Sequence, residues 1–216
     1  IAFTRPDDAG RAQVWLIPTS GGEARRLTSA VGGVTELAWS PDSSSLAFVS
    51  EVDPDRVTDD DGQPRVKVIR RIRYRDDGEG WRGDASRHLF VVGVEGGEAR
   101  QVTDGEGDDG AAAWSPDGSR IAFVSDRGES RDVEDRSGAY VVPASGGELE
   151  LWSEGLSTVA SVGWSPDASK LAVVASDQDT VSTNTQGWLF VLERGQGPVR
   201  LTDDSIKPAY YGTVIA

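Results

Sequence analysis

A sequence pattern that occurs three times constrains the fold of this chain more than any other feature. It consists of Trp-Ser-Pro-Asp followed by an apolar run, and its copies begin at Trp39, Trp114 and Trp164. Proline fixes φ near the value that the second position of a type I turn needs, and aspartate can accept a hydrogen bond from the backbone that follows. The apolar run of the second copy, residues 121–124, has the length and β-branched content of a strand that is covered on both faces. Each copy therefore predicts a strand, a tight turn and a buried strand.

The residue that follows the aspartate differs between the copies. Gly118 suits the last position of a type I turn, whereas Ser43 and Ala168 stand at that place in the other two copies. Because serine is a poorer turn residue than glycine, we expect the first hairpin to adopt a slightly different turn type.

A second repeat keeps step with the first. Gly-Gly-Glu occurs at residues 21–23, 96–98 and 146–148, with a looser version at 195–197, and an aromatic or aliphatic run precedes each copy. Together the two repeats supply four short strands and three turns per unit. The tryptophans are 75 and then 50 residues apart, and a propeller blade takes roughly 40–50 residues. The pattern therefore predicts an all-β fold, a β-propeller whose first full blade carries an insertion.

Other repeat architectures fit less well. No stretch of ten or more residues shows helical periodicity, which argues against alternating strands and helices. A β-solenoid has much shorter repeats. We predict one incomplete β-propeller domain over residues 1–216, with the following units: a partial blade at 1–28, a blade at 34–103 with an insertion at 51–87, blades at 111–152 and 160–202, and the start of a further blade at 203–216. Because a ring needs about four to eight blades, we expect the chain to be part of a longer protein.

The charge balance limits the partners. The chain has 36 acidic and 22 basic residues, a net charge of −14. Phosphate binding needs the opposite sign, so we expect neither nucleic acid nor an anionic membrane as the main partner. The chain has no cysteine, which excludes disulfides and thiolate chemistry and suits a cytoplasmic location.

The sequence contains no recognisable catalytic set. His88 is the single histidine, and no Gly-x-Ser-x-Gly motif is present. We therefore expect His88 to be structural, at the start of a strand. The acidic stretches 59–62 and 104–110 lack the alternation of a calcium loop and are interpreted as solvated loops. We expect no catalytic residue, no metal and no cofactor in this chain, and we assign Trp39, Trp114 and Trp164 to packing between blades.

The insertion contains the one basic stretch. From Val66 to Arg75 apolar and basic residues alternate, which predicts an amphipathic strand with Arg71, Arg73 and Arg75 on one face. One interpretation is a solvated face that pairs with the neighbouring acidic loop. The other is that these three arginines line a cavity or rim and bind anionic groups such as peptide carboxylates, which guanidinium groups hold bidentately.

The repeats resemble the propeller of the prolyl oligopeptidase family of serine peptidases, and most closely its acylaminoacyl-peptidase branch. The stretches that carry this resemblance are residues 21–28, 71–81 and 114–127. The resemblance implies that the chain forms about four blades of a seven-bladed propeller that caps an α/β-hydrolase domain. In that family peptides reach the active site through the propeller or a side opening, and folded proteins are excluded by size. The family's catalytic Ser, Asp and His match nothing in this chain, so we expect the chain alone to be inactive.

Two functions follow as hypotheses. The first is the gating and substrate-selecting part of a serine peptidase that hydrolyses short or N-acylated peptides. Its partners would be a peptide substrate, and the missing blades and hydrolase domain on the same or another chain, with self-association left open. The second is a non-enzymatic propeller of the TolB kind, which binds a protein partner in the bacterial periplasm and uses similar repeats.

Overall fold

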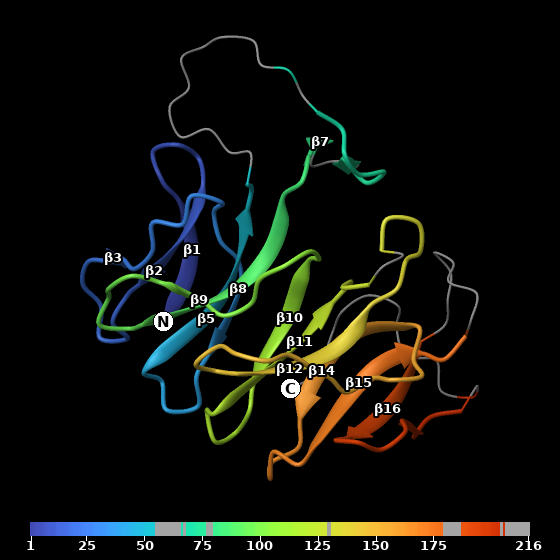
Figure 1. Ribbon diagram of the computed structural model, residues 1–216. Coiled ribbons are helices and arrows are strands. Elements are labelled where there is room, and N and C mark those ends of the chain that lie inside the picture. The colour runs from blue at the N-terminus through green and yellow to red at the C-terminus, as the bar shows by residue number, and fades with distance from the viewer. Residues whose placement is uncertain are drawn as a thin grey trace.

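The computed structural model describes residues 1–54, 66, 68–76, 80–128, 131–178, 187–203 and 205, and their regular structure consists of β-strands. Figure 1 shows these strands grouped into small sheets that follow one another from the N-terminus, in blue, to the C-terminal strands, in red. In this part of the chain, no helix has the length and hydropathy that a membrane span requires. The expected further blade at 203–216 lies almost wholly outside the described residues.

The strands form four main antiparallel sheets, which we number in chain order. The first sheet consists of β1 (Ala2–Pro6), β2 (Ala12–Leu16) and β3 (Arg25–Arg26). The second consists of β4 (Thr35–Trp39), β5 (Ser45–Val52), β8 (Ser86–Gly93) and β9 (Arg100–Gln101). The third consists of β10 (Asp109–Trp114), β11 (Arg120–Ser125), β12 (Gly138–Pro143) and β13 (Glu150–Leu151). The fourth consists of β14 (Thr158–Trp164), β15 (Lys170–Ser176), β16 (Trp188–Glu193) and β17 (Val199–Arg200).

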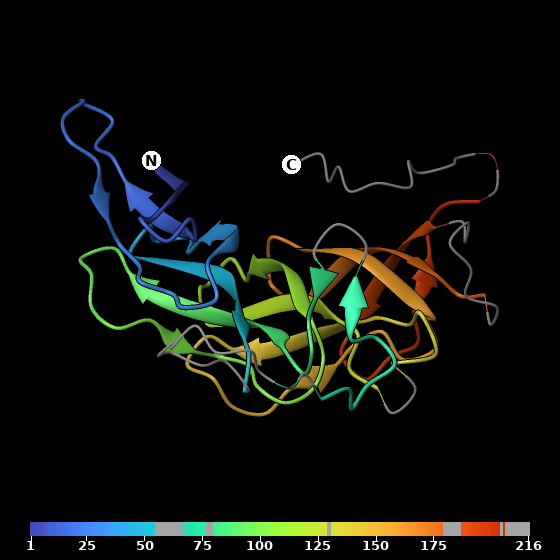
Figure 2. The ribbon, with the colours of Figure 1, turned by 90° about the horizontal axis from the view of Figure 1, so that it is seen from above.

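The sheets are arranged as blades around an axis. Their innermost strands, β4, β10 and β14, contact one another in turn, and Figure 2 shows the sheets in succession from blue to red. Apolar clusters fill the space between successive sheets: Val49 and Leu89 pack with Phe123, and Val141 packs with Leu171. The predicted all-β partial propeller is confirmed, and so is the burial of the strand that follows the second Trp-Ser-Pro-Asp copy.

The three Trp-Ser-Pro-Asp turns are held by the same contacts. In the second copy the Gly118 N–H donates to the Ser115 carbonyl at 2.8 Å, which closes a type I turn. The Ser115 hydroxyl donates to Asp117 Oδ1 at 2.5 Å, and the Ser119 N–H donates to the same oxygen at 3.0 Å. The aspartate thus fixes both sides of the turn, as the sequence predicts.

The expectation of a different turn at Ser43 was wrong. Ser43 and Ala168 have φ values of 58° and 59°, close to the 70° of Gly118. Their N–H groups close the turn at the same distance, 2.9 Å in both copies. The left-handed conformation costs a non-glycine residue only about 1–2 kcal/mol, and the repeated serine–aspartate contacts offset that cost.

These turns predict how stability depends on pH. The pKa values of Asp42, Asp117 and Asp167 are lowered to about 2, above all by the hydrogen bond from the serine two residues earlier. An unfolded chain has aspartate pKa values of about 3.9, so it binds more protons than the folded chain between pH 4 and pH 2. The three turns therefore stabilise the fold fully above about pH 4, and this contribution is lost as the pH falls towards 2. Urea midpoints measured from pH 5 to pH 2 should fall steeply in the natural chain and less steeply in Asp117→Asn. Equal slopes for the two proteins would contradict the assignment.

Tryptophans join the innermost strands of successive blades. Trp114 Nε1 donates to the Ala38 carbonyl at 3.1 Å, and Trp164 Nε1 donates to the Ala113 carbonyl at 3.0 Å. The predicted packing role holds for these two residues. Trp39 differs, because it is 40% exposed and makes no such bond within the described residues. The sheet that precedes this blade consists of β1, β2 and β3.

Arginines of the outermost strands bond to the residue that follows the third strand of the next blade, a role that the sequence did not reveal. Arg25 in β3 donates to the Val94 carbonyl of the second blade. Arg100 in β9 donates to the Ala144 carbonyl of the third blade at 2.6 Å. Both follow a Gly-Gly-Glu turn at the same spacing. That repeat therefore supplies a contact between blades as well as a turn.

The predicted amphipathic strand at Val66 to Arg75 was wrong. In the described residues of this stretch a strand begins only at β6 (Arg75–Asp76), which pairs with β7 (Gly80–Trp81) in a short hairpin. Val66 and Ile72 are strongly exposed instead of sharing a buried face. Alternation along a chain produces a strand only where a neighbouring strand pairs with it.

Candidate functional site

The two faces of the propeller differ in their connections. The Trp-Ser-Pro-Asp and Gly-Gly-Glu turns are tight and polar, and the Trp-Ser-Pro-Asp turns lie at the bottom of Figure 1. The connections from β5 to β8 and from β11 to β12 are longer, and their described residues lie at the top of that view. We call this side the loop face. Loops on a rigid scaffold are where binding residues concentrate, so the loop face is the candidate binding side of the propeller.

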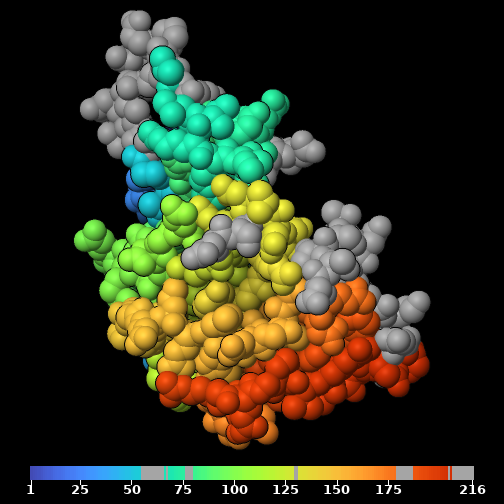
Figure 3. Space-filling model, turned by 45° about the vertical axis from the view of Figure 1, so that its right-hand side comes forward, coloured from blue at the N-terminus to red at the C-terminus, as the bar shows by residue number. Residues whose placement is uncertain are grey.

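A polar cleft of about 650 Å³ opens on the loop face, between the β5–β8 connection, the segment after β9 and the β11–β12 connection. Three arginines line it, Arg70, Arg71 and Arg131. Four carboxylates also line it, Asp84, Asp104, Glu106 and Asp132. We refer to it as the polar cleft. Figure 3 shows the two connections in contact, with the β5–β8 segment in teal and the β11–β12 segment in yellow.

An ion pair crosses from one blade to the next at this cleft. Arg71 Nη2 and Nε donate to Asp132 Oδ1 at 3.0 and 3.2 Å. Partial burial raises the pKa of Asp132, but the hydrogen bond and charge of Arg71 outweigh it, and the pKa lies below its ordinary value. The pair therefore stays charged at neutral pH and holds the two connections together.

Of the three arginines predicted to bind substrate, only Arg71 lines the polar cleft. Arg73 Nη2 donates to Asp135 Oδ1 and to the Glu134 carbonyl, both at 3.4 Å. Arg75 lies exposed in the β6–β7 hairpin. The partners of Arg71 and Arg73 lie in the β11–β12 connection. The acidic part of the insertion, residues 55–65, lies outside the described residues.

Sequence reasoning missed Arg131. Its side chain is only 6% exposed, and its Nη2 donates to Glu106 Oε2 at 2.8 Å. One signal could have identified it: the β11–β12 connection joins the same pair of strands in its blade as the insertion does in the second blade. Both connections therefore emerge on the same face.

A buried polar network lies beneath the cleft. Asp109 Oδ2 accepts hydrogen bonds from Thr103 Oγ1 at 2.5 Å and from Arg127 Nη2 at 2.7 Å. His88 Nδ1 lies 3.3 Å from the same oxygen, and His88 is buried within β8. This setting supports the structural role expected for His88. Within the ranges that the structure describes, no group of histidine or acidic side chains is arranged to hold a metal ion.

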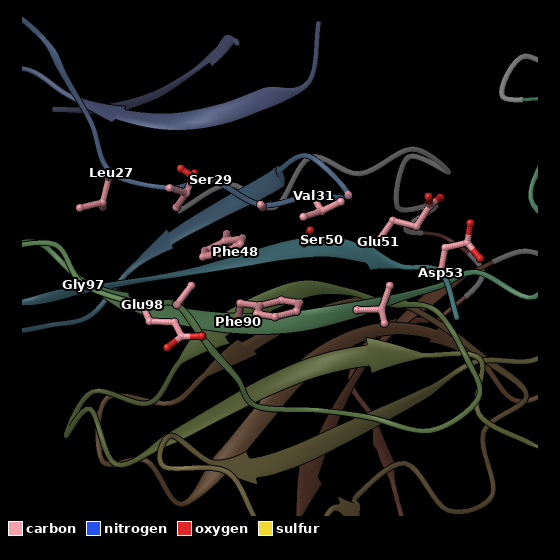
Figure 4. Close-up of a pocket in the computed structure, with 15 residues that line it drawn as sticks. Leu27, Ser29, Val31, Phe48, Ser50, Glu51, Asp53, Phe90, Gly97 and Glu98 are labelled. Atoms are coloured by element: carbon pink, nitrogen blue, oxygen red, sulfur yellow. The ribbon is translucent and has the colours of Figure 1, made fainter. Parts of the chain in front are cut away.

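A second hollow, of about 570 Å³, lies between the first and second sheets. Figure 4 shows Phe48 and Phe90 at its centre, and their rings stack with centroids 5.5 Å apart. Carboxylates lie towards its ends, Glu98 on one side and Glu51 with Asp53 on the other. The hollow is a groove between two blades with an apolar floor, and none of the described residues that line it is basic. The polar cleft, with facing charges of both signs, is the stronger candidate for recognising a ligand.

Comparisons with known proteins agree with the fold and with the resemblance. No family model matches the chain. The uncharacterized peptidase YuxL of Bacillus subtilis is 32% identical over 139 residues, which is 62% of this chain and 21% of YuxL. Dipeptidyl-peptidase 5 of Porphyromonas gingivalis is 32% identical over 97 residues, 45% of this chain and 10% of that protein. A TolB homolog of Chlorobium luteolum is 28% identical over 138 residues, 55% of this chain and 30% of the homolog.

Solved structures of two kinds share the fold. Pyrococcus horikoshii acylaminoacyl peptidase superposes with a TM-score of 0.64 at 18% identity, over 94% of this chain and 30% of the peptidase. A putative TolB of Agrobacterium tumefaciens superposes with a TM-score of 0.60 at 19% identity, over 92% of this chain and 59% of that one. At these identities the structures show the fold alone. The chain spans less than a third of each curated relative that it matches. The resemblance found in the sequence is confirmed, and the chain is a β-propeller segment similar to parts of peptidases such as YuxL and to TolB proteins.

Proposed function

We propose that this chain is part of the gating and substrate-selecting propeller of a serine peptidase that hydrolyses short or N-acylated peptides. The observation that carries the proposal is the 32% identity to the peptidase YuxL over 62% of the chain. Under this proposal the chemistry takes place in an α/β-hydrolase domain, where a serine is acylated and the oxyanion is held by preorganised donors. The chain itself has no catalytic residue, and its location is the cytoplasm.

The role of the propeller in this proposal is selection. The rigid blades restrict access to the hydrolase domain by size, so that short peptides enter and folded proteins are excluded. We keep Arg71, Arg73 and Arg75 as candidate contacts for anionic substrate groups. Of these three, Arg71 lies in the lining of the polar cleft, and the other two lie outside it.

The test uses the intact polypeptide that contains this chain. We expect it to be labelled by a fluorophosphonate, which reacts with activated serines, and to hydrolyse acetyl-alanine p-nitroanilide. Prior labelling should abolish the hydrolysis. A polypeptide that neither reacts with the fluorophosphonate nor cleaves acylated aminoacyl or short peptide substrates would overturn the proposal.

A non-enzymatic, TolB-like binding role is the second candidate. It is favoured by the identity to the Chlorobium luteolum TolB homolog over 138 residues. In that case the intact polypeptide would capture a protein partner and would show neither serine labelling nor peptide hydrolysis. The two measurements above therefore separate the candidates.

A further inference from the structure

We infer that the polar cleft is a binding site for a peptide carboxylate, and that the carboxylate binds Arg131 in exchange for Glu106. The inference deepens the proposed function and rests on it only in taking a peptide as the ligand. It is carried by the unequal burial of the two partners in one ion pair.

Arg131 is a fixed and nearly dehydrated cation. Its side chain is 6% exposed, and its Nη2 donates to Glu106 Oε2 at 2.8 Å. A guanidinium taken out of water needs an anionic or hydrogen-bonding partner, because losing that partner leaves a buried charge uncompensated. A carboxylate at this point of the cleft therefore stabilises the buried charge of Arg131.

Glu106 is the partner that can leave. Its side chain is 83% exposed, so it is hydrated already and loses little when it turns towards solvent. The neighbouring pair is different, because the side chains of Arg71 and Asp132 are both largely covered, with 18% and 27% exposed. The exchange of a protein carboxylate for a ligand carboxylate is thus favoured at Arg131 and disfavoured at Arg71.

The size and charge of the cleft define the ligand. A volume of about 650 Å³ lies within the usual range for small-ligand sites, roughly 300–1,000 Å³, and holds a short peptide end. The four lining carboxylates outnumber the three lining arginines. A phosphate or other multiply charged anion would therefore meet net repulsion, whereas a single carboxylate that replaces Glu106 leaves the balance unchanged.

The carboxylate has two sources in a peptide, the C-terminus and an acidic side chain. Three probes distinguish them: acetyl-Ala-Ala-Ala with a free C-terminus, its C-terminal amide, and acetyl-Ala-Glu-Ala amide. Binding is measured by calorimetry at low ionic strength on the intact polypeptide after fluorophosphonate treatment, so that the probes are not cleaved. We expect at least one of the two acids to bind about tenfold or more tightly than the neutral amide, in line with a charge-assisted hydrogen bond. The tighter acid identifies the source.

Variants at both partners test the exchange. Glu106→Gln removes the competing carboxylate and should tighten binding of the acid about two- to fivefold, the strength of an exposed ion pair. Arg131→Gln should abolish the preference for the acid over the amide. The matched control is Glu134→Gln, because Glu134 is an exposed glutamate paired with Arg136 at 2.6 Å outside the cleft lining. This control should leave binding unchanged.

The outcomes are decisive in both directions. Equal binding of both acids and the amide would overturn the inference, and so would weaker or unchanged binding in Glu106→Gln. If Arg131→Gln fails to fold, Glu106→Gln still decides, because Glu106 is largely exposed and glutamine keeps an oxygen that can accept from Arg131. A polypeptide that binds the acids but has no hydrolase activity would overturn the proposed function and leave this inference standing. Hydrolysis without a preference for a carboxylate would do the reverse.

Discussion

Replacing Asp109 by alanine is expected to destabilise the protein by about 3–5 kcal/mol, the usual cost of removing one partner of a buried charged network. The Asp109 side chain has no exposed surface. Its carboxylate accepts from Thr103 at 2.5 Å, from Arg127 Nη2 at 2.7 Å and from Arg127 Nε at 3.2 Å, and it faces His88. Without it, Thr103 and Arg127 lose their common acceptor, and His88 loses the carboxylate that it faces. The free energy of unfolding in urea measures the effect.

The matched control is Asp135→Ala. Asp135 also pairs with an arginine of another connection, Arg73, but at 3.4 Å and with 69% of its side chain exposed. Exposed pairs contribute about 0–1 kcal/mol, so this variant should lie within about 0.5 kcal/mol of the natural chain. Equal losses in the two variants would show that Asp109 has no special structural role.

Replacing Gly32 by alanine is expected to cost about 1–3 kcal/mol, the usual range for inserting an atom into a filled space. The added Cβ would lie 1.9 Å from the Glu51 carbonyl oxygen and 2.8 Å from the Glu51 amide nitrogen. Both are backbone atoms of β5, so no side chain can turn aside to make room. The segment after β3 must shift away from the second blade, and a lower thermal midpoint and a lower urea midpoint report that shift.

Gly197 provides the comparison for this substitution. No atom lies within 4 Å of the Cβ that alanine would add at Gly197. Alanine there should be neutral or slightly stabilising, because it restricts the unfolded chain. A Gly32→Ala variant as stable as Gly197→Ala would mean that the segment after β3 is not packed on β5 as described.

The fold could be predicted because its signals are local and repeated. Equivalent turns follow Trp39, Trp114 and Trp164. The hydrogen bonds that hold each turn are made by residues within a few positions of its proline and aspartate. The failures have physical reasons as well. The alternation from Val66 to Arg75 looked like a strand but had no neighbouring strand to pair with, and Ser43 accepted a left-handed backbone because its turn is held from both sides.

The candidate site could be predicted only in part. Arg71 stood out because it belongs to a basic cluster in an acidic chain. Arg131 did not, since a single arginine in a polar loop carries no local signal. Its importance comes from burial and from its distance to Glu106, which is 25 positions away in the sequence. Such properties arise when the segment before β10 folds against the β11–β12 connection, and the residue types on either side of Arg131 do not reveal them.

The ion pair between Arg71 and Asp132 has a mechanical consequence. It ties the long connection of one blade to that of the next at a point remote from the innermost strands, where the tryptophan bonds already join the same blades. Two contacts at separate places, the Arg71–Asp132 ion pair and the Trp114–Ala38 hydrogen bond, oppose rotation of one blade relative to the other. With a single contact, the blades could rotate about it. The spacing between these two blades is thus fixed at two places. The width of the polar cleft therefore depends on the packing of the blades and not on movement of the loops that line it.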